Sequence, residues 1–228
     1  MKKKIKKIIT IIKAAPQLKT RIITALLFLI AGICFEITAK TLSTYNILGL
    51  FYLSNVTGQI YQTIMSVSCT GLGQTSSSAK KLQISFPFYI KLLVNSILFF
   101  IVSFNSVYIA SKPALDMSIK ENISLQCFNI LMFSAICFFS SIYEILSHKF
   151  FGLSLVGMIL FIFIFITMIS YSIIHPQSFY NITNLTFPIA ITLGFLILIA
   201  GSLLSTLFAN LLYKYPISAH VMRFNNKV

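Results

Sequence analysis

Five polar side chains inside an otherwise apolar stretch form the arrangement in this sequence that is best suited to contact a solute. They are Tyr52, Asn55, Gln59, Gln62 and Ser66. Their spacing of three or four residues places them on one face of a helix. Amide groups in hydrocarbon cost free energy unless they are hydrogen-bonded, so this polar stripe must face protein or a water-filled cavity. Two interpretations follow: a substrate path, or the hydrogen bonds of a helix–helix or subunit interface.

The segment after the polar stripe combines helix breakers, capping residues and positive charge. Gly71 and Gly73 interrupt the helix, the serines at 76–78 can cap a new one, and Pro87 interrupts the chain again before the next apolar stretch. We predict a short basic helix over residues 76–86 that is suited to dock into a partner protein. The alternative is an ordinary basic loop that holds the membrane topology.

The sequence lacks the residue patterns of catalysis and of nucleotide or metal binding. The run GLGQTSSS has no lysine after its second glycine and no strand before it, so it is not a phosphate-binding loop. His148, His175 and His220 do not form a metal cluster, and no HExxH, serine–histidine or paired-glutamate pattern occurs. We therefore predict no catalytic residue, no metal site and no cofactor bound by this chain.

Cysteines and acidic residues carry the remaining candidate chemistry. The cysteines are Cys34, Cys69, Cys127 and Cys137. They lie in or beside apolar stretches without CxxC spacing, which indicates small buried or lipid-facing residues rather than disulfides or zinc ligands. The acidic residues are Glu36, Asp116, Glu121 and Glu144. None is expected mid-membrane, so we predict that they pair or snorkel at an interface and do not couple protons.

The composition places these features in a membrane. Of the 228 residues, 57% are hydrophobic and only 10% are charged, whereas a soluble domain carries about 25% charged residues. The basic residues behind the net charge of +14 cluster outside the apolar stretches, which suits anionic lipid and membrane topology better than nucleic acid. We predict an all-α integral membrane protein that does not bind nucleic acid.

Six apolar segments can each cross a bilayer, which requires about 20 residues in helical conformation. They are residues 22–38, 47–68, 88–110, 124–146, 151–174 and 187–213. The connections are too short for a separate domain, so we predict a single transmembrane domain over 1–228. The connection from 174 to 187 either dips into the outer leaflet or lies on the membrane surface.

The first 16 residues have the pattern of an interfacial helix. Isoleucines at positions 5, 8, 9 and 12 share one helical face. Lysines occupy most of the other face and are expected to meet anionic headgroups: Lys3, Lys6, Lys7 and Lys13. A signal peptide is the competing interpretation, and Pro16, Lys19 and Arg21 argue against it because they interrupt the apolar run too early.

The basic residues also predict the orientation. With six spans and a cytoplasmic N-terminus, only Lys40, Lys112 and Lys120 of the 18 Lys and Arg residues fall in outer loops. An asymmetry of this size follows the positive-inside rule. We therefore expect a multi-pass protein of the plasma membrane with both termini in the cytoplasm.

This layout resembles the permease subunit of type-two ABC exporters. The resemblance covers nearly the whole chain in the order of its elements: an interfacial helix, two spans, a short inner helix and four further spans. In sequence it covers SSSAKKLQISFPFYIK, residues 76–91, which is similar to the small-polar, basic, Leu-x-x-Ser-x-Pro run of that family. There the short helix is the coupling helix, which contacts the ATPase. The resemblance implies that role for Ser78, Lys80, Lys81, Leu82 and Ser85.

The resemblance also implies the partners. Two permease copies, identical or related, would enclose the substrate path, and two cytosolic ATPase subunits would bind ATP and Mg²⁺. Compact permeases of this kind include Gram-positive exporters of amphipathic toxins such as phenol-soluble modulins, and lantibiotic or bacitracin self-protection systems. The cargo implied is an amphipathic peptide, and the polar stripe would line its path.

Two other classes of function stand beside this one. A secondary carrier, or the substrate-binding membrane subunit of an uptake system, also uses small bundles of six spans. A membrane enzyme would need a nucleophile with a base, for which Cys69 and His148 are the available residues.

Overall fold

The computed structural model is helical wherever it has regular secondary structure. It describes residues 10, 13, 15–42, 47–75, 79–112, 118–174 and 185–225, and these contain no strand. The prediction of an all-α chain is therefore confirmed for the described ranges. The predicted interfacial helix over 1–16 lies mostly outside them, with only Thr10, Lys13, Ala15 and Pro16 described, and so does most of the 174–187 connection.

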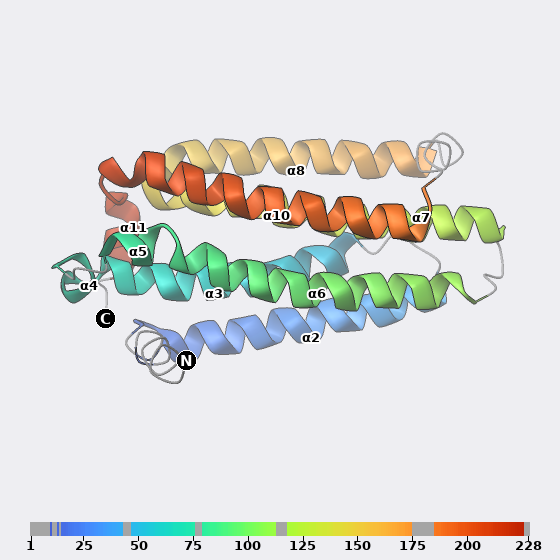
Figure 1. The fold of residues 1–228 in the computed structure, drawn as a ribbon, viewed down its shortest axis with the longest axis horizontal. Coiled ribbons are helices and arrows are strands. Elements are labelled where there is room, and N and C mark those ends of the chain that lie inside the picture. The colour runs from blue at the N-terminus through green and yellow to red at the C-terminus, as the bar shows by residue number, and fades with distance from the viewer. Residues whose placement is uncertain are drawn as a thin grey trace.

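Six long helices run side by side along the long axis of the molecule (Figure 1). They are α2 (Leu18–Leu42), α3 (Ile47–Cys69), α6 (Phe86–Ala110), α7 (Ile119–Lys149), α8 (Phe151–Ile174) and α10 (Phe187–Leu211). Each contains nearly all of one predicted apolar segment, and a short 3₁₀ helix, Leu212–Lys214, extends the last one. Successive long helices run in opposite directions, as consecutive membrane spans would.

Three short helices gather at one end of the bundle: α4 (Gly71–Thr75), α5 (Ala79–Gln83) and α11 (Ala219–Asn225) (Figure 1). We call this the basic end, because most of the described Lys and Arg residues lie there: Lys19, Arg21, Lys80, Lys81, Lys91, Lys149 and Lys214. The opposite end carries Lys40, Lys112 and Lys120.

Local sequence signals explain where several helices begin. Ser118 and Glu121 form a capping box at the start of α7: Glu121 N donates to Ser118 Oγ at 3.3 Å, and Ser118 N donates to Glu121 Oε2 at 2.9 Å. Pro87 and Pro188 occupy the first turns of α6 and α10, where the missing N–H has no helical partner to lose. At the basic end, α3 stops at Cys69 and Gly71 begins α4, so the predicted break is confirmed at this point.

The main core lies between α3, α6, α7 and α10, around the fully buried Phe99 and Phe133. Small residues on α10 allow this packing. A Cβ at Gly194 would lie 2.9 Å from Phe99 Cε2 and from Ser134 Oγ, and one at Gly201 would lie 2.9 Å from Phe138 Cδ2. Close backbone approach at small residues is the usual contact between membrane helices.

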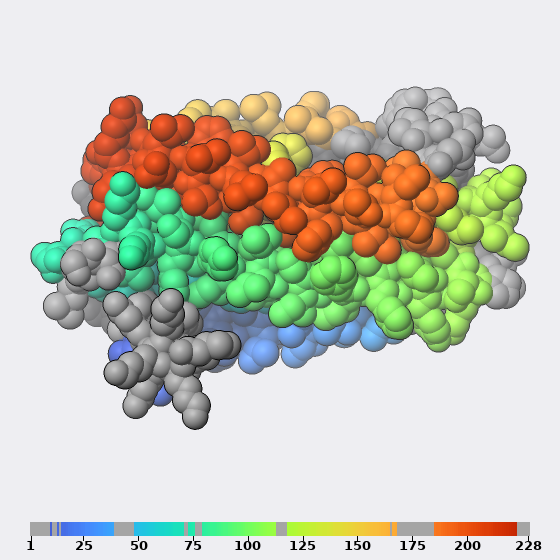
Figure 2. Space-filling view, in the orientation of Figure 1, coloured from blue at the N-terminus to red at the C-terminus, as the bar shows by residue number. Residues whose placement is uncertain are grey.

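Many large apolar side chains are exposed on the outside of the bundle, and the space-filling view shows α6 and α10 side by side on one of its faces (Figure 2). Four helical stretches are long and apolar enough to cross a membrane: Leu18–Thr38, Ala79–Ala110, Ile119–Lys149 and Phe187–Lys214. The assignment to the membrane class is supported at this level. The helix α3, which carries the polar stripe, is not among the four, and α8 qualifies only as a shorter apolar helix, Phe151–Ile164. The count of six spans therefore stays a prediction.

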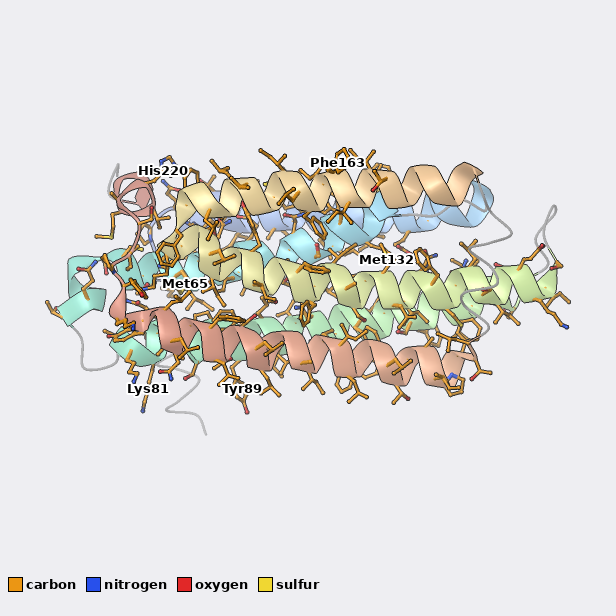
Figure 3. All side chains as sticks on the ribbon, turned by 90° about the horizontal axis from the view of Figure 1, so that it is seen from above. Met65, Lys81, Tyr89, Met132, Phe163 and His220 are labelled. Carbon is orange, nitrogen blue, oxygen red and sulfur yellow. The ribbon has the colours of Figure 1, made fainter. Side chains whose placement is uncertain are left out.

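The helix α8 flanks the bundle beside α7 and exposes apolar side chains around most of its described surface. Figure 3 shows Phe163 of α8 pointing outward, whereas Met65 and Met132 lie inside the bundle. Of the α8 side chains that the structure describes, only Ser154 is buried. This helix is therefore a wall of the bundle rather than part of its core.

Candidate functional site

Four of the five residues of the polar stripe line two cavities of the bundle. The first, which we call the α3–α7–α8 cavity, has a volume of about 270 Å³. Asn55, Gln59 and Gln62 line it from α3, Ser140 and Glu144 line it from α7, and aromatic and apolar residues of α7 and α8 complete its walls. The predicted face of α3 thus brings three of its five members together around one space.

The other two members of the stripe lie elsewhere. Ser66 is buried and lines a second cavity at the basic end. Tyr52 packs against α2, where its ring stacks on Phe35 at a centroid distance of 5.5 Å and tilts toward Phe28 at 5.8 Å. For Tyr52 the structure therefore favours the interface interpretation over the substrate path.

Glu144, which lines the α3–α7–α8 cavity, forms an ion pair with Lys91 of α6. Lys91 Nζ lies 2.6 Å from Glu144 Oε2 and also donates to Ser140 Oγ at 3.1 Å. Lys91 is 1% exposed and Glu144 is 6% exposed. Glu144 forms a pair as expected, but inside the bundle rather than at an interface.

Lys91 differs from most of the other basic residues on the inner side of the predicted topology. The sequence near it gives no sign of this, because its acidic partner on α7 is 53 positions away. In the structure it is a buried residue in the second turn of α6. Its charge therefore serves the packing of α6 on α7 and adds nothing to an exposed basic surface.

The two carboxylate oxygens of Glu144 have different neighbours. Oε2 binds Lys91, and Oε1 faces α3, since a Cβ placed on Gly58 would lie 3.2 Å from it. Gly58 lines the α3–α7–α8 cavity together with Glu144. Because Gly58 has no Cβ, it leaves room for the Glu144 carboxylate between α3 and α7.

The second cavity, which we call the basic-end cavity, has a volume of about 300 Å³. Residues of five helices line it, among them Arg21 from α2, Gln62 and Ser66 from α3, Glu144, Ser147 and His148 from α7, Phe151 from α8, and His220 from α11. The ring of His220 stacks on Phe151 at 4.1 Å, which positions α11 beside the start of α8. Gln62 and Glu144 line both cavities.

The predicted basic helix exists in shorter form, as α5. Lys80, Lys81 and Ser85 are exposed, and Figure 3 shows Lys81 pointing away from the bundle at the basic end. Leu82 differs from the expectation that it contacts a partner, since it is 6% exposed and faces this chain's own interior. Ser78 lies outside the described residues.

The predicted membrane-interface lysines are mostly beyond the described ranges. Lys3, Lys6 and Lys7 lie outside them, and Lys13 is helical and exposed. Among the described residues, no three His, Cys, Asp or Glu side chains group in a way that could hold a metal ion. Cys69, one half of the enzyme hypothesis, donates its thiol hydrogen to the carbonyl oxygen of Met65 in its own helix at 3.4 Å.

No protein-family model matches this chain, and neither a curated protein nor a solved structure shows a significant similarity to it. The cavities, the ion pair and the basic helix are therefore interpreted from their own geometry.

Proposed function

We propose that this chain is the transmembrane subunit of an ATP-driven ABC exporter. In this proposal it lines the substrate path and receives the motion of a separate cytosolic ATPase through α5. The observation that carries the proposal is the continuous connection from α5, exposed at the basic end, to a carboxylate in the wall of the α3–α7–α8 cavity.

That connection has two arms. Two residues, Ile84 and Ser85, join α5 to α6, and Lys91 in the second turn of α6 binds Glu144 of the cavity wall. The second arm runs through α7, where Lys149 Nζ donates to Gln83 Oε1 of α5 at 3.4 Å and to the carbonyl oxygen of Tyr215 at 2.8 Å. A displacement of α5 would therefore shift α6 and α7 together, as packed helices move between two arrangements.

The exposed face of α5 suits a protein partner at the cytoplasmic side. Lys80 and Lys81 project from a helix whose Ala79 and Leu82 are buried, so the helix is fixed to the bundle while its charges stay accessible. The basic end would face the cytoplasm by the positive-inside rule. In this proposal the ATPase binds at α5, and the chain crosses the plasma membrane six times with both termini inside.

The cavity chemistry supports an amphipathic cargo. Amides and a carboxylate share its wall with aromatic and aliphatic side chains, a mixture that suits polar and apolar groups of one molecule. A volume of about 270 Å³ is too small for a folded peptide, whose helix alone is about 10 Å wide. Export would need α8 to move away from α7, or a second copy of the chain to enlarge the path.

The test is whether α5 controls a partner ATPase. The chain would be purified in lipid nanodiscs after co-expression with candidate ABC ATPases of the same cell, and ATP hydrolysis would be measured with and without amphipathic peptide. Replacing both exposed lysines of α5, Lys80→Glu with Lys81→Glu, should lower co-purification and peptide-stimulated hydrolysis. The control is Lys112→Glu with Lys120→Glu at the opposite end, which should leave both unchanged. Equal behaviour of the two double variants would contradict the proposal.

One observation favours a second candidate, a proton-coupled carrier. A buried carboxylate that lines a cavity is the group such carriers use, and Glu144 has this position. Transport by the chain alone in proteoliposomes, driven by a pH gradient and lost in Glu144→Gln, would establish this function instead.

A further inference from the structure

We propose that the basic-end cavity binds a phosphate-bearing anion through Arg21, His148 and the polar side chains of α3. This inference concerns a different cavity from the substrate path above, and it holds for any transport function of the bundle.

The first observation is a buried cation in the wall of the cavity. Arg21 lies in the first turn of α2 and is 7% exposed, although it carries a permanent charge. Long cationic side chains near helix ends ordinarily extend into water or headgroups. A guanidinium that turns inward to line a cavity of about 300 Å³ is instead placed to donate to an anion.

The second observation is a polar atom without a partner. Nε2 of His148 is buried and forms no hydrogen bond with the described residues, and the residue as a whole is 5% exposed. Buried polar atoms are nearly always hydrogen-bonded. His148 lines the same cavity as Arg21, so an anion bound there could accept a hydrogen bond from its imidazole.

The remaining wall supplies neutral polar groups. Gln62 and Ser66 lie next to each other on α3, one helical turn apart, and both line this cavity. Gln62 is an exposed residue. The hydroxyl of Ser66 donates to the carbonyl oxygen of Thr63 at 2.8 Å and keeps its lone pairs for other contacts. Hence Gln62 is the available neutral donor.

The charges around the cavity favour an anion. Glu144 is its acidic member, and the ion pair with Lys91 at 2.6 Å offsets that charge. His148 and His220 add no negative charge, and Arg21 contributes a positive charge to this wall. Lys149, next to His148, adds a further cation whose ammonium group binds Gln83 and Tyr215.

The depth of the cavity in a bilayer favours phosphate as the anion. With a rise of 1.5 Å per residue, the 31 residues of α7 are about 46 Å long, while the hydrocarbon core of a bilayer is about 30 Å thick. His148 is the second-last residue of α7, and Arg21 is the fourth of α2. If these helices span, both lie at the depth of lipid phosphates, where a phosphate could come from a lipid headgroup or from solution.

The experiment uses the full chain in dodecyl maltoside and three probes. Native mass spectrometry would follow binding of dioleoylphosphatidylglycerol and of dioleoylglycerol, which has the same chains without phosphate. Thermal unfolding would follow sodium phosphate against sodium chloride at equal ionic strength. Arg21→Gln should weaken phosphatidylglycerol binding about tenfold, the value of one charge-assisted hydrogen bond. Lys19→Gln is the matched control, because it removes an exposed charge two residues away on the same helix, and it should leave binding within about twofold.

Because Arg21 is buried, its replacement could impair folding, so Gln62→Leu serves as a second variant at an exposed position. It should reduce phosphatidylglycerol binding while leaving the melting temperature of the lipid-free protein unchanged. If phosphatidylglycerol binds and sodium phosphate has no effect, the site binds lipid. If sodium phosphate stabilises the protein and Gln62→Leu removes that stabilisation, the site binds the free ion. Equal binding of the two lipids without any effect of phosphate, or equal effects of Gln62→Leu and Lys19→Gln, would overturn the proposal.

Discussion

Lys91 and Glu144 form a hydrogen-bonded ion pair, with Nζ and Oε2 2.6 Å apart and both side chains shielded from solvent. The removal of two charges from water is offset only when they meet in good geometry with further hydrogen bonds, and here Ser140 Oγ accepts one from Lys91 at 3.1 Å. The pair joins the start of α6 to the end of α7. It thereby connects the short helix at the basic end to the wall of the α3–α7–α8 cavity.

Breaking this pair from one side should cost far more stability than removing both charges. Glu144→Leu or Lys91→Met alone would leave an uncompensated buried charge, at a cost of about 3–5 kcal/mol in the free energy of unfolding. The double variant should recover most of that loss. Unfolding in mixed micelles would measure all three variants, and a double variant no more stable than the worse single one would contradict a direct interaction.

The glycines of the bundle should divide into two groups by what surrounds them. Gly201→Ala places a Cβ 2.9 Å from Phe138 on α7 and should separate α10 from α7, at a cost of about 1–3 kcal/mol. Gly152→Ala has no neighbouring atom within 4 Å and should stabilise α8 by up to about 1 kcal/mol, because alanine favours the helix. Melting temperatures compare the two, and a destabilising Gly152→Ala would contradict the open environment described for α8.

The positions of the long helices could be predicted from the sequence because hydrophobicity and length are local properties. A run of about 20 apolar residues must satisfy its backbone hydrogen bonds internally in lipid, so the apolar segment 151–174 coincides with α8, Phe151–Ile174. The polar stripe could also be predicted from local sequence, because a spacing of three and four residues defines one face of a helix. For Asn55, Gln59 and Gln62 that face is the cavity face.

The rest depended on which helices meet. Nothing near Lys91 in sequence indicates Glu144, and nothing near Tyr52 indicates that Phe35 would stack on it. The burial of Leu82 could not be predicted for the same reason. Its neighbours in the KKL run are exposed lysines, and only the packing of α5 against the bundle shows that Leu82 is buried. Contacts between distant segments are set by packing, which a single sequence does not specify.

The orientation of the bundle can be tested at its two ends. In a chain whose native cysteines are replaced, Lys81→Cys and Lys112→Cys introduce exposed thiols at the basic end and at the opposite end. A membrane-impermeant maleimide added to intact cells should label Lys112→Cys within minutes and Lys81→Cys only after lysis. The reverse pattern would place α5 outside the cell, where no cytosolic ATPase could reach it.

The two interpretations of the polar stripe can be separated by the reactivity of thiols placed along it. Only the thiolate reacts with methanethiosulfonate reagents, and a thiol in apolar surroundings rarely ionises. In the same cysteine-free chain, Gln59→Cys lies in the α3–α7–α8 cavity and Phe163→Cys lies on the outward face of α8. If the cavity is a water-filled path, Gln59→Cys should react at least about tenfold faster than Phe163→Cys in proteoliposomes. If the stripe only holds helices together, both should react slowly and Gln59→Leu should instead lower the melting temperature.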